Sequence, residues 1–237
     1  MTEWKRKRFW TRVETAETDD GFTIALDDRP VRTPAKESLR LPSRALAEAV
    51  AREWDAQQGE VDPETMPLTR LANSALDKVA SQHGAVANLV AEYGESDLLC
   101  YRAERPEGLV ERQRAHWDGL LHWAERQLGI RLEVQSGLMP IDQPEPSRIE
   151  IRRRTRALGP FDLTAFHELV ALSGSWVIGY AALTGERAPE DLWRVAVIDE
   201  LWQEEQWGED EEATAARRAR QDAFLTAHRF ADLSRQG

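Results

Sequence analysis

The spacing of hydrophobic residues changes once along the chain, at about Leu41. Before that point, Phe22, Ile24 and Leu26 alternate with smaller or polar residues, as expected for a half-buried strand. An Asp-Gly pair at residues 20–21 and the segment at residues 27–30 predict turns on either side of it. Residues 1–42 are therefore predicted to form a small antiparallel β unit.

A unit of this size needs support, because an isolated pair of strands is only marginally stable in water. Two arrangements could give the β unit this support. The unit packs on the rest of the protein, or it recruits the strand-like segment Ile130–Val134 as a further strand.

After Leu41 the hydrophobic period becomes helical. Ser43 is placed as an N-cap, and Leu46, Val50 and Trp54 follow at four-residue intervals on one face. Similar patterns predict further helices at residues 68–79, 85–93, 109–127, 149–158, 192–207 and on to 228, with the most apolar one opening at Pro160. The sequence predicts an α+β protein, with an N-terminal antiparallel β unit at 1–42 packed with a larger, all-helical C-terminal domain at 43–237.

Small residues concentrate in one apolar segment of the helical part. Ser173, Gly174, Ser175 and Gly179 lie between strongly hydrophobic neighbours. Without large side chains, this segment lets another helix approach closely, so we expect it at the centre of the helical domain.

Composition and charge narrow the possible partners. The 237 residues carry a formal net charge of -11, which disfavours nonspecific attraction to nucleic acid or anionic lipid. No apolar run reaches membrane-spanning length, and the first ten residues lack the apolar region of a secretory signal. The single cysteine, Cys100, fits a reducing compartment. We therefore expect a cytoplasmic protein with no stable membrane association and no nucleic-acid partner.

The residues that most often carry chemistry do not form a recognisable catalytic or metal-binding pattern. The five histidines do not fall at ligand spacings, and neither of the common glycine-rich phosphate-binding motifs occurs. Cys100 lies between apolar neighbours and is expected to be a buried, inert thiol. The sequence thus predicts no metal site and no cofactor.

The most unusual stretch runs from Asp199 to Arg220. Eight carboxylates lie between Asp199 and Glu212, and three arginines follow at positions 217, 218 and 220. On a helix, Glu200, Glu204 and Trp207 would share one face with Gln203. Like charges at this spacing cost about 0.2–0.5 kcal/mol per pair. Either a partner surface or an internal basic cluster must offset that cost.

Two tryptophans, Trp202 and Trp207, stand among these acids. Aromatic residues with one polar end are common at protein interfaces, which favours a binding role. Alternatively, Trp207 covers the end of its helix ahead of Gly208. The two interpretations are compatible with each other.

Taken together, seven runs resemble the ATP-twelve family, the assembly chaperones of the F-type ATP synthase that act on its alpha subunit. The runs follow the family's order over nearly the whole chain: KRFW (7–10), GFTIALDDRPVRTPAK (21–36), LAEAVAREWDAQ (46–57), MPLTRLANSALD (66–77), ESDLLCYRAE (95–104), LSGSWVIGYAAL (172–183) and DELWQEEQWGEDEEA (199–213). The resemblance implies an N-terminal β-rich unit, a C-terminal helical domain and no catalysed reaction.

The resemblance also implies a site and a partner. The family's Glu-x-x-Gln-x-x-x-Trp-Gly pattern falls here on Glu200, Gln203, Trp207 and Gly208. These residues are expected to bind the free alpha subunit, with Glu211 as a further contact. Mitochondrial members of the family begin with a targeting extension that this sequence lacks, so we expect a protein of the bacterial cytoplasm, with eukaryotic relatives in the mitochondrial matrix. We also expect a monomer.

Two features depart from or add to this picture. Asp28 stands where the family often has glycine, which affects a turn more than a function. Asp97 and Arg102 frame a compact apolar cluster that includes Tyr101, and these three residues are expected to give structural support.

Two rival functions stay open at this stage. An enzyme would use Glu200 and a carboxylate of the 209–212 run as acid and base on a cationic substrate, and would need a deep pocket with perturbed carboxylates. A generic acidic adaptor would bind any basic protein, with strong salt dependence and no client preference.

Overall fold

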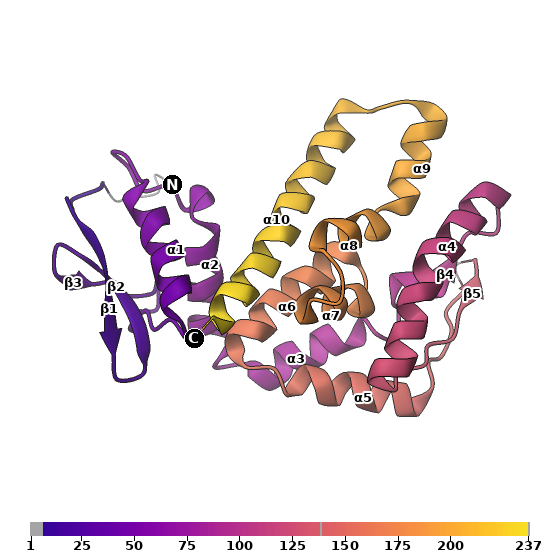
Figure 1. The fold of residues 1–237 in the computed structure, drawn as a ribbon, viewed down its shortest axis with the longest axis horizontal. Helices are drawn as coiled ribbons and strands as arrows, with labels where there is room; N and C mark the ends of the chain where they lie inside the picture. Colours follow the sequence, from indigo (N-terminus) through magenta and orange to yellow (C-terminus); the bar gives the residue numbers. More distant parts are fainter. Residues whose placement is uncertain (1–6, 138, 237) are drawn as a thin grey trace. The chain divides into compact units, whose positions relative to one another are not determined.

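The computed structural model describes residues 7–137 and 139–236 (Figure 1). Its contacts divide the chain into two compact units. We call the first the N-terminal unit; it takes in the described parts of Met1–His83, Gly159–Ala165 and Arg229–Gly237. The second, the helical unit, comprises Gly84–Leu158 and Phe166–His228. The predicted division at residues 42 and 43 stays a prediction.

An antiparallel sheet opens the chain, as the alternation of residues predicts. Its strands are β1 (Val13–Thr18), β2 (Gly21–Leu26) and β3 (Arg29–Pro30), in that order across the sheet. Val13 pairs with Leu26 and Thr18 with Gly21, so a two-residue turn joins β1 to β2. The strand predicted at residues 130–134 is wrong: that segment has no regular structure and is not part of this sheet.

The second turn explains the family departure at residue 28. Asp27 and Asp28 both have a positive φ, of 47° and 68°, between β2 and β3. Aspartate tolerates this left-handed conformation better than most residues because its short side chain finds local hydrogen bonds. The Asp27 carboxylate accepts hydrogen bonds from the backbone N–H groups of Thr11 and Arg12. The turn is therefore kept without glycine.

Helical elements complete the N-terminal unit: α1 (Arg44–Asp55), a short 3₁₀ turn η1 (Pro63–Thr65), α2 (Pro67–Ser74) and a π turn η2 (Ala75–Val79). Helix α1 packs against β1 and β2. Ile24 and Leu41 are fully buried, as are Leu46 and Val50 of α1. The change of period at Leu41 therefore marks the point where the chain turns from the sheet to the helix that covers it.

Ser43 is the N-cap of α1, as predicted, and has a second role. Its hydroxyl oxygen accepts a hydrogen bond from Leu46 N at 3.0 Å, and the hydroxyl donates to the Leu233 carbonyl. We expect Ser43→Ala to lower the free energy of unfolding by about 1–2 kcal/mol, because a cap and a buried acceptor both lose their partner. Urea unfolding of this variant beside Ser38→Ala, an exposed position, measures the difference. Equal stability of the two variants would contradict the capping role.

The helical unit is built almost wholly from helices. They are α3 (His83–Glu92), α4 (Glu107–Trp123) with the π turn η4 (Ala124–Leu128), α5 (Glu145–Arg156), α6 (Pro160–Ser173), α7 (Trp176–Thr184), α8 (Pro189–Ala196), α9 (Ile198–Trp207) and α10 (Glu211–Arg235). The first residue of α3, the first turn of α6 and the end of α10 belong to the N-terminal unit. A 3₁₀ turn, η3 (Leu98–Cys100), precedes β4 (Tyr101–Arg102), which pairs in parallel with β5 (Gln135–Ser136). The predicted α+β class is confirmed, with this two-residue pair as an addition.

The segment rich in small residues has the close packing that its sequence predicts. Gly174, with φ of 70°, separates α6 from α7, and Ser175 caps α7 by accepting from Ile178 N. At Gly179, an added Cβ would lie 2.6 Å from a methyl group of Val170 and 3.3 Å from the Phe166 ring. Because no side chain fits in that space, α7 approaches α6 at this position through its backbone.

One predicted helix is divided. The helix expected at residues 192–207 breaks at Val197, whose φ of -106° and ψ of 21° end α8 and let α9 begin. Trp117 of α4 donates its indole N–H to the Val195 carbonyl at 2.9 Å, so a buried side chain satisfies a carbonyl at the end of α8. The hydrophobic period does not reveal the break because both helices keep similar spacing.

Candidate protein-binding site

The stretch singled out in the sequence forms a helical hairpin, which we call the acidic hairpin and define as residues 198–220. It consists of α9, the connection at residues 208–210 and the first part of α10; Figure 1 shows the connection joining the two helices at one end. Gly208, with φ of 93°, ends α9, and its N–H donates to the Glu204 carbonyl. Such a left-handed turn favours glycine, which accounts for Gly208 in the motif.

Carboxylates of α9 pair with arginines of α10. A carboxylate oxygen of Glu200 accepts from Arg220, and Glu204 lies 2.6 Å from Arg217 and also accepts from the Thr214 hydroxyl at 3.2 Å. An internal basic cluster, one of the two ways to offset the cost of the like-charged pair, is thus present. The helical spacing could show that Glu200 and Glu204 share a face, but not which arginine they meet.

The two tryptophans of the acidic hairpin have different surroundings. Trp202 packs against α4: a Cβ on Gly108 would lie 2.7 Å from its ring, and the Arg112 guanidinium stands 4.8 Å from the ring centroid. Arg112 also holds Glu205 through two hydrogen bonds of 2.7 and 2.8 Å, which lower the pKa of that carboxyl. Trp202 is therefore a half-buried residue that packs against α4.

Trp207, by contrast, is 79% exposed at the end of α9. The interpretation that it covers the end of its helix therefore does not account for most of its surface. Gln203 is also exposed, one turn earlier. A large aromatic side chain left in water is the kind of residue that interfaces bury.

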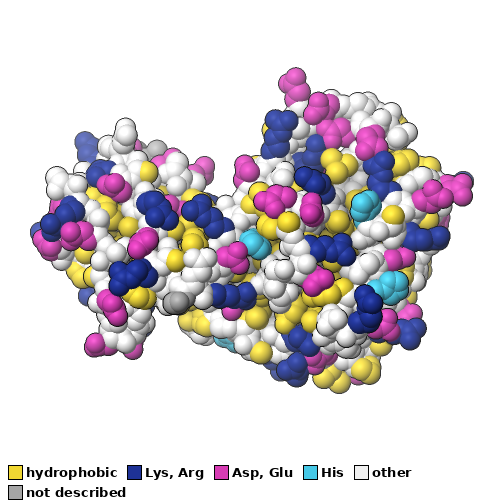
Figure 2. Space-filling view, viewed as in Figure 1, with side chains coloured by type: hydrophobic (Ala, Val, Ile, Leu, Met, Phe, Trp, Pro, Cys, Tyr) yellow, Lys and Arg dark blue, Asp and Glu magenta, His cyan; other side chains and the backbone are white. Residues whose placement is uncertain are grey.

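The acidic run at residues 209–212 stands at the N-terminus of α10. Asp210 caps this helix by accepting from Ala213 N at 2.8 Å, while Glu211 and Glu212 occupy its first turn and are exposed. Carboxylates are favoured there because the helix dipole places partial positive charge at this end. Acidic side chains gather at this tip of the molecule in Figure 2. The run thus has a structural reason and also presents negative charge beside Trp207.

Asp97, predicted as a support, is buried within the helical unit between η3 and α7. It is fully buried and accepts from the backbone N–H groups of Leu99 and Val177, each at 3.0 Å. Burial raises its pKa to about 6, although these N–H donors act in the opposite direction. One carboxyl group therefore joins η3 to the first turn of α7.

Its neighbour Cys100 is the inert thiol that the sequence indicates. The side chain is buried, and burial together with the negative charge of Asp97 raises the pKa of the thiol above its usual range. A thiol held protonated in this way is a poor nucleophile.

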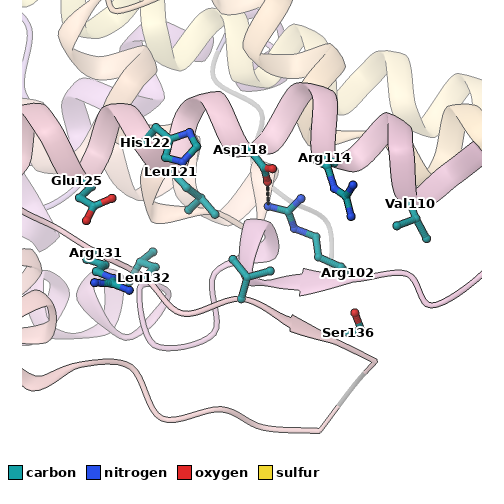
Figure 3. A pocket seen from close by; sticks show the side chains of 11 residues that line it. Arg102, Val110, Arg114, Asp118, Leu121, His122, Glu125, Arg131, Leu132 and Ser136 are labelled. Carbon is teal, nitrogen blue, oxygen red and sulfur yellow. Dashed lines mark ion pairs between the residues drawn. The ribbon is translucent and has the colours of Figure 1, made fainter. Parts of the chain in front are cut away.

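Tyr101 and Arg102 form β4, and Arg102 borders a pocket. Its guanidinium donates to the Leu99 carbonyl at 2.8 Å and pairs with Asp118 of α4 at 2.8 Å. Figure 3 shows this ion pair in the wall of a pocket of about 380 Å³ between α4 and the strand segments. In Figure 3, His122 lies on the side of the pocket toward Glu125, and Ser136 lies on the opposite side, toward Val110.

The arginines of α5 make ion pairs and stay partly exposed. Arg152 meets Glu95 at 2.6 Å, while Arg153 and Arg154 both pair with Glu150. The hydrogen bonds from Arg153 are the main reason why the pKa of Glu150 falls to about 2. The spacing of Glu150 before Arg153 and Arg154, at three and four residues, is a signal that the sequence already contains.

Within residues 7–137 and 139–236, His, Cys, Asp and Glu side chains do not gather in threes as a metal site requires. Over the same residues, every helix is too short or too polar to cross a bilayer.

Comparison with known proteins places the chain. Residues 7–125, half of the chain, match the family described as ATP12 chaperone protein. Protein atp12, mitochondrial, of Schizosaccharomyces pombe is 26% identical over 219 residues, covering 87% of this chain and 75% of that protein. Protein ATP12, mitochondrial, of Saccharomyces cerevisiae is 21% identical over 252 residues, covering 87% and 77%.

A solved structure agrees over the whole length. The crystal structure of Atp12 from Paracoccus denitrificans superimposes with a TM-score of 0.94 at 45% sequence identity, covering 98% of this chain and 100% of that one. Agreement of family, sequence and fold confirms the resemblance. The chain belongs to the ATP12 chaperone family, the assembly chaperones of ATP synthase that its sequence motifs resemble.

Proposed function

We propose that this protein binds the free alpha subunit of the F-type ATP synthase through the acidic hairpin and prevents its aggregation before assembly. The observation that carries the proposal is the 79% exposed indole of Trp207 beside the exposed carboxylates of residues 209–212. An apolar contact ringed by charge is the usual composition of an interface core and its rim.

The physical need for such a chaperone follows from the client. A subunit awaiting its neighbours exposes apolar surface that assembly will later bury, and patches of more than a few hundred Å² invite aggregation. The acidic hairpin would cover part of that surface with Trp207 and would select basic groups around it through Glu211 and its neighbours. Binding of this kind needs no chemistry, in keeping with a chaperone family.

The geometry of Glu200 bears on the rival enzyme. A general acid or base works on a substrate in a pocket that excludes water, whereas Glu200 is about 41% exposed and pairs with Arg220 on the facing helix. The generic acidic adaptor differs in another way, because charge alone would give it no preference among basic proteins. As part of the same proposal, the protein acts as a monomer in the bacterial cytoplasm.

The proposal is tested with purified alpha subunit from the same organism. We expect an equimolar amount of this protein to suppress the light scattering of alpha subunit diluted from denaturant and to form a complex that elutes together in gel filtration. The beta subunit and an unrelated basic protein serve as matched clients. Equal binding to all three would favour the adaptor, and absence of binding to the alpha subunit would overturn the proposal.

Variants of Glu200 and Arg220 test whether Glu200 contacts the client or only supports the acidic hairpin. The pair is about 41% exposed on each side, so breaking it should cost at most about 1 kcal/mol of stability. We expect Glu200→Gln and Arg220→Gln to lose similar stability in urea unfolding, but only Glu200→Gln to weaken binding of the alpha subunit, by roughly tenfold. If both variants bind like the wild type, Glu200 serves the hairpin and does not contact the client.

A further inference from the structure

A second surface, in the N-terminal unit, has the composition of a binding groove that the acidic hairpin does not explain. It has a volume of about 660 Å³ and lies between the β2–β3 region, the end of α1 and the start of α2. Its size is within the range of about 300–1,000 Å³ of ligand sites. We call it the basic groove and define it by Phe9, Trp10, Arg29, Arg32, Trp54 and Arg70, among its lining residues.

Aromatic side chains form the apolar part of the basic groove. The rings of Trp10 and Trp54 are 5.4 Å apart, and Phe9 meets Trp10 edge-on at 5.2 Å. Phe9 is 62% exposed although it belongs to this cluster. The cluster therefore presents apolar surface to a partner instead of closing over itself.

Both indoles also have an unused donor. Trp10 is only 3% exposed, and the buried Nε1 atoms of Trp10 and Trp54 donate to no acceptor among the described residues. A buried donor without a partner costs about 1–3 kcal/mol, and most such groups in proteins are satisfied. Because both Nε1 atoms are buried, they lie behind the surface of the basic groove and are not open to a partner there.

The charge of the basic groove is opposite to that of the protein as a whole. Four cationic residues, Arg29, Arg32, Lys36 and Arg70, are among the residues that line it, and none of the described lining residues is a carboxylate. None of the four forms an ion pair within residues 7–137 and 139–236; the nearby Asp77 accepts from the backbone of Ala35 instead. In a chain of net charge -11, this local excess of positive charge is complementary to an anionic partner.

We propose that the basic groove binds an extended, acidic polypeptide segment that carries a large apolar side chain. The apolar side chain would lie on the exposed ring of Phe9, and the carboxylates would meet the four cations. A single-stranded nucleic acid also combines stacking with negative charge, but its many phosphates would be repelled by the overall charge of -11, whereas a short peptide brings only a few carboxylates.

The proposal is tested by selecting binders from a displayed library of random short peptides. This test does not require knowing which protein carries the segment in the cell. We expect the wild-type protein to enrich sequences with Asp or Glu around Phe, Trp or Leu. A fluorescein-labelled peptide made from the enriched sequences should lose affinity by at least about tenfold in Arg32→Glu/Arg70→Glu, and also as salt is raised. The matched control is Arg52→Glu/Lys78→Glu, which makes the same charge change at positions outside the basic groove and should bind normally.

Several outcomes would overturn the proposal. The first is that the selection enriches no acidic peptides. The second is that Arg32→Glu/Arg70→Glu binds the peptide as tightly as the wild type. The third is that oligothymidine displaces the labelled peptide better than the unlabelled peptide does. Self-association that the groove variant abolishes would make a second copy of this chain the occupant, through its own acidic hairpin. Because Phe9 is exposed, Phe9→Ala is a second groove variant that should keep the stability of the wild type. It should also lower the affinity for the peptide. Thermal unfolding checks that both groove variants are folded.

Discussion

Replacing Asp97 by alanine is expected to lower the free energy of unfolding by about 2–4 kcal/mol. The carboxylate is the acceptor for two buried backbone N–H groups, those of Leu99 and Val177. Each donor left without a partner costs about 1–3 kcal/mol, and the lost side chain leaves space in a packed core. Urea unfolding followed by circular dichroism measures the loss. Asp222→Ala, at an exposed position of α10, is the matched control; equal stabilities would show that Asp97 does not join η3 to α7.

The same carboxyl group predicts the sign of a pH effect. Its pKa is about 6 in the folded protein, above the ordinary value of 3.8, because of burial. Between about pH 4 and 6 the folded state therefore holds a proton that the unfolded state has lost, so this group's contribution to stability falls as pH rises. We expect the stability of the wild type relative to Asp97→Asn to decline by about 2–3 kcal/mol across that window and then to level off.

Other carboxyl groups act in the opposite direction but cancel in that comparison. The pKa values of Asp27, Glu150 and Glu205 are lowered, so their stabilising contributions are lost as pH falls below about 4. They are present in both proteins. A relative stability that rises from pH 4 to 6 would mean that the N–H donors outweigh burial at Asp97.

The largest effect expected on binding is that of Trp207→Ala, which should weaken the complex with the alpha subunit by about tenfold to a hundredfold. Exposed tryptophans that become buried at an interface are frequent hot spots, worth about 2 kcal/mol or more. Because Trp207 is exposed in the free protein, its loss should leave the unfolding midpoint nearly unchanged. Trp207→Phe keeps an aromatic ring and should retain most of the affinity.

The control for this measurement is Met139→Ala, which removes another exposed apolar side chain, 72% exposed, from the helical unit. Biolayer interferometry with immobilised alpha subunit compares the variants. Normal binding by Trp207→Ala, together with binding by the wild type, would place the client contact outside the acidic hairpin.

Much of this fold was predictable because its signals are local. The alternation in β2, the cap at Ser43 and the small residue at Gly179 each act over a few neighbouring residues. The break at Val197 was not predictable, since a buried indole from α4 helps to satisfy the end of α8. The absence of a strand at residues 130–134 likewise depends on distant contacts, because only the following residues meet β4.

The sequence predicted which residues form the candidate site, but not which of them pair with each other. The family motif pointed to both Glu200 and Trp207, but their surroundings in the structure differ. Glu200 is engaged by Arg220, while Trp207 is left in solvent. Pairings across α9 and α10 depend on how two helices rotate against each other, which periodicity on one helix cannot fix.

The ion pairs of the acidic hairpin differ in how strongly salt can act on them. Glu204 and Arg217, near the tip, are only 20% and 15% exposed, whereas the acidic run beyond them is solvated. Mobile ions screen exposed charges far more than shielded ones. At high ionic strength the acidic run would thus lose its attraction while the hairpin still holds Trp207 in position. The binding free energy that remains in concentrated salt would then measure the contribution of the Trp207 indole.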